Sequence, residues 1–232
     1  MELIEALRTT GAAREFTDDP VTDEVLGRVL DNARFCPSGG NQQGWRVVVV
    51  QDPQIRTRLR DLYLPGWYDY LAMNAAGIRP WAPLNDRDAE TAAIGGASAI
   101  RAQADAGPGG FAEHLDQAPV LLALLVDLKV LAAVDRDHDR YTFAGGASVY
   151  PFAWSVLLAA RDEGLGGVMT TMAIREEHAV LELLHVPADH ALAAVVVLGH
   201  PLHQPHRLTR RPVEAFTTVD HVDGPPFRPG TA

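Results

Sequence analysis

Hydrophobic residues occur along this chain in two patterns, a helical spacing and short continuous runs. A helix over 22–35 is predicted because apolar residues recur every three or four positions: Val25, Leu26, Val29, Leu30 and Ala33. Thr22 is expected to cap it, with Asp23 and Glu24 in the first turn. Runs of apolar and β-branched residues at 45–50, 119–128, 168–172 and 192–198 predict four strands.

Further helices complete the order of elements. A short helix is expected to end at Thr9-Thr10-Gly11, a basic helix is expected from Pro53 toward Tyr63, and an amphipathic helix over 176–184. Residues 148–163 are apolar nearly all round, which predicts a helix buried on every side. Strands mixed with helices in this order indicate an α+β domain with a central sheet flanked by helices.

The segment 64–113 has a looser pattern. Eleven glycines and prolines interrupt its first part, 64–110, and Trp67, Tyr68, Tyr70 and Trp81 supply large rings. A long irregular segment in a compact domain is typical of functional or mobile regions. It is predicted to be a lid with aromatic substrate contacts, or alternatively an aromatic patch that packs on its own core.

Composition narrows the function. The chain has 232 residues and a formal net charge of −10, which argues against non-specific nucleic-acid binding and against anionic membrane surfaces. A single cysteine, Cys36, fits a reducing cytoplasm. No apolar run reaches 18 residues and the first residues lack the pattern of a signal peptide, so a cytoplasmic protein is expected.

Two segments superficially suggest metal sites. The run 135–140 alternates acidic and basic residues, but it lacks the glycine and glutamate of a calcium loop and is predicted to be a solvated turn. His200, His203 and His206 are spaced by three, but two prolines exclude the helix that would align them. No metal site is predicted.

The loop between the helix at 22–35 and the strand at 45–50 carries a dense polar motif, Pro-Ser-Gly-Gly-Asn-Gln-Gln at 37–43. Pro37 blocks helix continuation, and the two glycines permit close backbone approach to a ligand. The motif therefore suits a phosphate- or polyol-bearing ligand. The residues alone are equally compatible with an ordinary helix-to-strand turn.

The sequence of 33–45, A-R-F-C-P-S-G-G-N-Q-Q-G-W, resembles the A-R-x-A-P-S-x-x-N-x-Q-P/G-W motif of the nitroreductase family of FMN-dependent oxidoreductases. The apolar helix at 148–163 with the following Gly-Leu-Gly, and the strand that ends in Leu-Gly-His-Pro, are similar to further family segments. The resemblance implies a nitroreductase-like fold with a central mixed sheet, in an obligate homodimer with two FMN sites at the interface. It implies one domain over 1–204 and a C-terminal arm, 205–232, that reaches the partner subunit.

The resemblance also assigns FMN contacts. The connector after the first helix corresponds to a family segment that binds the phosphate and the flavin edge, at Thr10, Ala12 and Arg14. This chain keeps the last arginine of that segment, but it has Thr10 or Gly11 and Ala12 where the family has an arginine and a serine. Arg8 is an alternative cation, although the sequence does not show whether it reaches the phosphate.

Other contacts are implied from elsewhere in the chain. The partner subunit is expected to contribute Pro37, Ser38, Gly39 and Asn41. The strand end is expected to approach the ring with Met169, Thr170 and Thr171, where the Thr171 backbone N–H supports flavin N5 as the catalytic contact. Two cations near the C-terminus, Arg210 and Arg211, are expected at the phosphate.

The implied activity is hydride transfer from NAD(P)H through FMN to a small nitroaromatic or quinone-like electrophile, in a ping-pong sequence. Two alternatives remain at this point. One is a flavin- or deazaflavin-dependent dehydrogenase of a natural-product or peptide substrate on the same fold, suggested by the altered connector. The other is a dimeric binding module without a cofactor.

Overall fold

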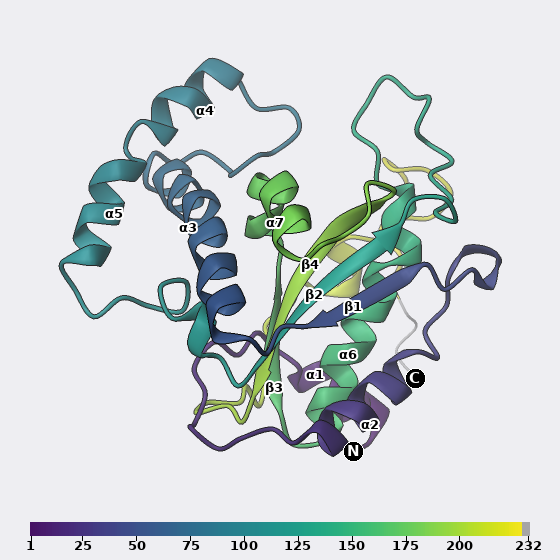
Figure 1. The fold of residues 1–232 in the computed structure, drawn as a ribbon. Coiled ribbons are helices and arrows are strands. Elements are labelled where there is room, and N and C mark those ends of the chain that lie inside the picture. Colours follow the sequence, from purple (N-terminus) through teal and green to yellow (C-terminus); the bar gives the residue numbers. More distant parts are fainter. Residues whose placement is uncertain (229–232) are drawn as a thin grey trace.

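The computed structural model describes residues 1–228 (Figure 1). Its main helices are α1 (Leu3–Thr9), α2 (Asp23–Ala33), α3 (Pro53–Ala75), α4 (Arg87–Ile94), α5 (Ala97–Asp105), α6 (Tyr150–Asp162) and α7 (Glu177–Leu183). Its strands are β1 (Trp45–Val49), β2 (Val120–Asp127), β3 (Gly166–Thr170) and β4 (His190–Gly199). All four predicted strands are therefore present, each within two residues of its expected ends. The Thr22 cap is confirmed, because its hydroxyl accepts a hydrogen bond from the Val25 N–H at 3.4 Å.

The four strands form one sheet in the order β1-β2-β4-β3. Every neighbouring pair is antiparallel, so the mixed sheet expected from the sequence is wrong for these strands. The one parallel pairing among the described residues is an isolated bridge between Ala12 and Gly167. The two central strands are buried along nearly their whole length, which explains why both read as continuous apolar runs.

Helices cover both faces of this sheet (Figure 1). Side chains alternate along a strand, so β2 directs Leu122 and Leu124 into a core shared with α2 and α6. The intervening Leu121 and Ala123 point into a second core shared with α3 and α7. The α+β architecture predicted from the sequence is confirmed.

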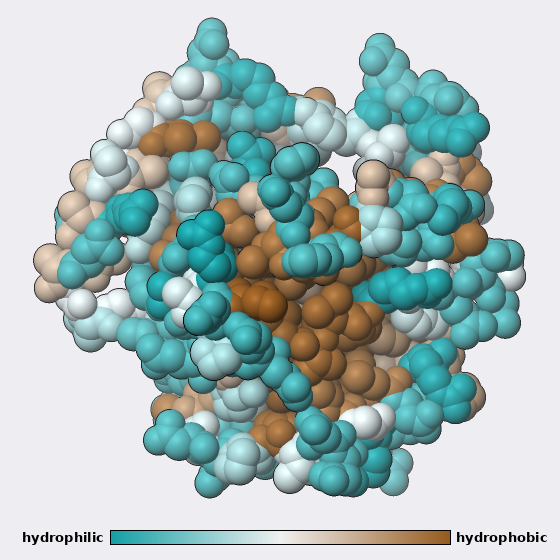
Figure 2. Space-filling model, viewed as in Figure 1, coloured by the Kyte–Doolittle hydropathy of each residue, from teal (hydrophilic) through white to brown (hydrophobic). Residues whose placement is uncertain are grey.

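The helix α6 is less buried within one chain than its sequence predicts. Its inner face packs Phe152, Val156 and Ala160 against the sheet, but Trp154 is 38% exposed and Tyr150 is 40% exposed. The neighbouring helix α1 also leaves Leu3, Ile4 and Leu7 exposed. Figure 2 shows a further hydrophobic area in the middle of its view, where Figure 1 draws the strands. A single chain thus leaves several large apolar side chains on α1 and α6 exposed to solvent.

The helix α3 continues well past Tyr63, where the sequence pattern predicted its end. It contains Pro65 and runs through the aromatic stretch to Ala75. Tertiary contacts compensate for the hydrogen bond that proline cannot make, because Tyr63, Tyr68 and Met73 are all buried on this helix. The segment 64–113 is therefore mostly helical, with α4 and α5 following.

The acidic–basic run at 135–140 is an exposed turn over 136–140, as predicted, but its first residue, Asp135, is buried. Asp135 is 3% exposed, and its Oδ2 accepts hydrogen bonds from the Phe143 N–H at 2.9 Å, the Ala144 N–H at 3.2 Å and Arg140 at 3.0 Å. These donors hold the pKa of Asp135 down, to about 2. Asp135 thus anchors the long loop between β2 and α6.

Arg56, on α3, is partly buried. Its guanidinium donates to the backbone carbonyls of Asp116, Val50 and Ala118, and so ties α3 to the start of β2. Burial lowers the pKa of this arginine. No helix in the described part of the chain has the length and apolar character needed to cross a membrane.

Two glycines test the packing of these helices. Gly27 on α2 has nothing within 4 Å of an added Cβ, whereas a Cβ at Gly66 on α3 would lie 2.7 Å from the Met172 carbonyl oxygen. We expect Gly27→Ala to raise the free energy of unfolding by about 0.5–1 kcal/mol. Gly66→Ala should lower it by about 1–3 kcal/mol. Urea unfolding followed by circular dichroism measures both, and equal effects would contradict the described packing.

The Asp135 anchor predicts a pH-dependent stability. A carboxyl whose pKa is depressed in the folded state stabilises the fold above its unfolded pKa, near 3.8, and loses this contribution as the pH falls toward about 2. We expect Asp135→Asn to lower the melting temperature at neutral pH, and the difference from wild type to shrink across that interval. Asp137→Asn, at an exposed neighbouring carboxylate, is the matched control and should have little effect at any pH. A pH-independent difference for Asp135→Asn would contradict the anchor.

Candidate functional site

The predicted ligand residues lie at the two opposite edges of the sheet. The loop 37–43 leads into β1 at one edge, and the connector at 10–16 runs along β3 at the other. Three strand spacings separate the edges, which corresponds to roughly 14 Å. We call these two groups of candidate residues the β1 half-site and the β3 half-site.

In the β3 half-site, the connector is held as an extra short strand. The Ala13 N–H donates to the Gly167 carbonyl at 2.9 Å, and Phe16 bridges Pro201. This pairing buries Ala13 and leaves Ala12 and Arg14 exposed on the outer side. The structure thus brings these two predicted residues to the surface beside β3.

The end of β3 supplies the other predicted contacts. Met169 and Thr170 are partly buried, and Thr171 is exposed directly after the strand, at the start of a 3₁₀ turn (Met172–Glu176). The Tyr63 hydroxyl on α3 lies 3.1 Å from Thr170 Oγ1, and burial raises the pKa of this tyrosine. Tyr63 was missed by the sequence reasoning, because only the folded chain brings α3 against this strand end.

Aromatic rings continue from this point along α3. Tyr63 stacks on Trp67 at 6.3 Å between centroids, and Trp67 stacks on Tyr70 at 5.5 Å. Phe111 meets Tyr63 edge to face at 6.5 Å, and the guanidinium carbon of Arg14 is 6.0 Å from the Phe111 ring. The rings expected in the lid segment therefore lie next to the β3 half-site.

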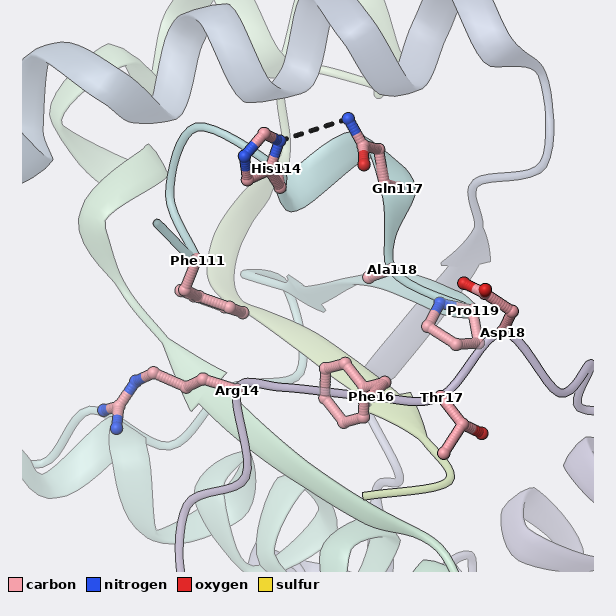
Figure 3. Close-up of a pocket in the computed structure, with 9 residues that line it drawn as sticks. All are labelled: Arg14, Phe16, Thr17, Asp18, Phe111, His114, Gln117, Ala118 and Pro119. Carbon is pink, nitrogen blue, oxygen red and sulfur yellow. Dashed lines mark hydrogen bonds between the residues drawn. The ribbon is translucent and has the colours of Figure 1, made fainter. Parts of the chain in front are cut away.

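A cavity of about 210 Å³ lies beside the connector (Figure 3). Phe16, Thr17 and Pro119 line one side, and the hydrogen-bonded pair His114–Gln117 lies above them. The Arg14 side chain extends away from the Thr17 end. The cavity is smaller than the roughly 300 Å³ at which drug-sized ligand sites begin. It flanks the β3 half-site without being large enough for a flavin nucleotide.

In the β1 half-site, the loop is tightly turned. Gly40, Asn41 and Gln43 all have positive φ, at 58°, 53° and 51°. Ser38 Oγ accepts from the Gln43 N–H at 3.0 Å, which leaves its own hydroxyl hydrogen free to donate. The Gly39 N–H donates to Ser148 Oγ at 2.9 Å, so the loop is fixed to the segment before α6. Pro37, Gly39 and Asn41 remain exposed.

Near the end of α1, cations from both ends of the chain meet. Arg8, Arg207 and Arg210 line one cavity of about 470 Å³ with Leu7 and Leu208. Arg211, the other predicted cation, is exposed but does not line it. Thr10 is buried beside this region and its Oγ1 has no hydrogen-bond partner within residues 1–228. These donors fit a phosphate: guanidinium groups with an unpaired hydroxyl are typical ligands of that dianion.

No group of three or more potential metal-ligating side chains occurs in the part of the chain that the structure describes. The spaced histidines after β4 therefore do not converge among these residues.

The model of the nitroreductase family matches residues 7–200, which include both half-sites. The chain belongs to the nitroreductase family. The resemblance carried by the motif at 33–45 is thereby confirmed. The matched range ends before Arg207 and Arg210, so the C-terminal cations lie outside it.

Individual relatives of this family member differ in their reactions. The chain is 30% identical over 217 residues to a 5,6-dimethylbenzimidazole synthase of Rhodospirillum rubrum, covering 86% of this chain and 85% of that protein. It is 23% identical to an FMN reductase [NAD(P)H] of Bacillus subtilis, covering 96% and 74%. The solved structure of iodotyrosine deiodinase bound to FMN and 3-iodo-L-tyrosine has a TM-score of 0.62 at 21% identity, covering 91% and 96%. The family and fold are therefore clear, whereas these names do not agree on one substrate.

Proposed function

We propose that this family member is an FMN-dependent oxidoreductase that transfers hydride from NAD(P)H to a small electrophile such as a nitroaromatic or quinone. The division of the predicted ligand residues between opposite sheet edges carries this proposal. A β1 half-site on one copy and a β3 half-site on another complete one flavin site, and a two-fold dimer contains two of them.

The uncovered apolar side chains support a dimer of this kind. Leu3, Ile4 and Leu7 on α1 are 66%, 58% and 44% exposed, and Trp154 on α6 adds an aromatic ring. A second copy would remove these side chains from water, and apolar burial is the main favourable term in stable association. The arm at 205–232 is proposed to reach the partner, although 229–232 lie outside the described residues.

Each residue has a proposed task. Arg14 binds the polar edge of the flavin, and Arg210 with Arg211 neutralises its phosphate. Ser38, Gly39 and Asn41 of the other copy donate hydrogen bonds from the opposite side. Bound FMN supplies the hydride chemistry, since no side chain of this site is a strong reductant. The Thr171 backbone N–H is proposed to face N5, where a donor stabilises negative charge.

The aromatic rings on α3 suggest the substrate class. Trp67 and Tyr70 are partly buried beside the β3 half-site and offer flat apolar faces. Planar aromatic or quinone-like electrophiles stack favourably on such rings. We place the reaction in the cytoplasm, in keeping with a single cysteine in the chain.

One observation favours a second candidate function. Thr10 or Gly11, and Ala12, occupy connector positions where the family motif has an arginine and a serine, so this chain lacks two polar side chains of that motif. The alternative is dehydrogenation of a natural-product or peptide substrate with bound flavin or deazaflavin. This alternative requires the same two half-sites. In it the substrate, and not NAD(P)H, reduces the bound cofactor.

The spectrum of the purified protein separates these functions. We expect a yellow protein that releases FMN on denaturation and loses its flavin absorbance on addition of NADPH or NADH under anaerobic conditions. Bound flavin that neither nucleotide reduces would favour the second candidate. A colourless protein that neither FMN nor a deazaflavin reconstitutes would contradict both and favour a binding module without a cofactor.

Complementation tests the shared site. We expect Arg14→Glu and Asn41→Asp each to bind little FMN when alone. Co-refolding the two variants in equal amounts should restore about a quarter of the wild-type occupancy, because half of the dimers are mixed and each mixed dimer has one intact site. Absence of any restoration, with mixed dimers demonstrated by mass, would contradict a site shared between copies.

A further inference from the structure

The cavity at the end of α1 joins the two ends of the chain. Its lining comes from Leu7 and Arg8 on one side and from residues 206–210 on the other. We call the segment 204–210 the strap, because it crosses over the chain directly after α1. The connector itself supplies no arginine here, since Gly11 and Ala12 occupy the corresponding positions.

The strap is fixed to α1 by specific contacts. Gln204 Nε2 donates to the Thr9 carbonyl at 3.0 Å. Pro205 and Leu208 fill the space above Gly11, where an added Cβ would lie 2.9 Å from Pro205 Cγ and 3.0 Å from Leu208 Cδ2. A larger residue at this position would push the strap away. The loss of the connector arginine and the close approach of the strap are therefore linked through Gly11.

The three guanidinium groups of this cavity have no acidic partner. Within residues 1–228, salt bridges engage other arginines, such as Arg28 and Arg60, but none involves Arg8, Arg207 or Arg210. Three exposed cations that line one cavity create a local positive potential, which favours the binding of an anion. It is all the more notable in a chain whose net charge is −10.

A buried hydroxyl points to the same conclusion. Thr10 is 7% exposed, and its Oγ1, which can donate to an anion, has no hydrogen-bond partner in the described chain. A buried polar atom without a partner is costly, and a bound group can remove the cost.

We propose that Arg8 and Arg207, together with Arg210, hold the phosphate of the flavin nucleotide, and so supply the contacts that an arginine and a serine of the connector make in the family motif. This inference rests on the proposed function, because it needs FMN as the ligand. Arg8 comes from the helix and Arg207 from the strap, so phosphate binding clamps the strap onto α1. The flavin ring then depends on Arg14, and the phosphate on Arg8, Arg207 and Arg210.

Comparison of FMN with riboflavin isolates the phosphate contacts, because the two ligands differ only by that group. Dissociation constants are measured for the purified protein after flavin removal, by quenching of flavin fluorescence. We expect Arg8→Gln and Arg207→Gln each to weaken FMN binding by about 10- to 100-fold and to leave riboflavin binding unchanged within about two-fold. Inorganic phosphate should compete with FMN in the wild type, and more weakly in both variants.

Arg101→Gln is the matched control, because Arg101 is an exposed arginine on α5 that pairs only with Asp105 at 3.8 Å. It should change neither constant. Circular dichroism and the melting temperature of each variant report whether it folds. Arg8→Lys should recover part of the FMN affinity, since lysine retains the charge without the planar fork.

The outcomes separate the two proposals. Wild-type protein that binds neither flavin overturns the proposed function. Suppose that the wild-type protein binds FMN more tightly than riboflavin, and that Arg8→Gln and Arg207→Gln bind the two ligands with the same ratio of dissociation constants as the wild type. This result overturns the assignment of the phosphate, while the proposed function stands. Equal weakening of FMN and riboflavin also overturns it, because the variants would then act through the general fold of the site.

Discussion

The antiparallel pairing of β2 with β4 is the constraint on which the rest of this structure depends. Both strands are buried on both faces, so they occupy the middle of the sheet and leave β1 and β3 as its edges. The loop at 37–43 and the connector at 10–16 are thereby kept apart, each on its own edge. No rearrangement short of breaking this buried pair would join them within one chain. Association of two chains is the simpler way to complete a site.

A second consequence of this arrangement is the meeting of the chain ends at β3. The connector pairs with Gly167, the strand β4 ends at Gly199 beside the start of β3, and the strap returns over Gly11. Residues nearly 200 positions apart thus form one cationic cavity on an otherwise acidic protein. Small residues at Gly11 and Gly167 are needed there because backbone segments pass close to each other.

Local patterns in the sequence were sufficient for the strands, for the Thr22 cap and for the motif loop before β1, because each depends on neighbouring residues. The course of α3 through Pro65 could not be read in this way, since buried aromatic residues on that helix override the proline. The same reason applies to Arg56, whose partners lie on other segments. The partners of Asp135 lie in its own long loop, where only the folded course of the loop brings them together.

In the candidate site, too, some residues could be identified from local sequence and others only from the folded chain. The family motif identified Arg14, Ser38 and Asn41 from the sequence, and the structure places them on accessible surfaces at the two edges. Tyr63 and Arg207 could not be identified, because no local signal distinguishes a tyrosine that meets Thr170, or an arginine that meets Arg8, from others of their kind. Only long-range packing creates these neighbours.

Native mass spectrometry of the flavin-loaded protein tests the central claim most directly. Two half-sites on opposite sheet edges predict a dimer that carries two FMN molecules, and monomers that carry none at any dilution. A monomer with one firmly bound FMN would contradict the account, because it would show that a single chain contains the whole site.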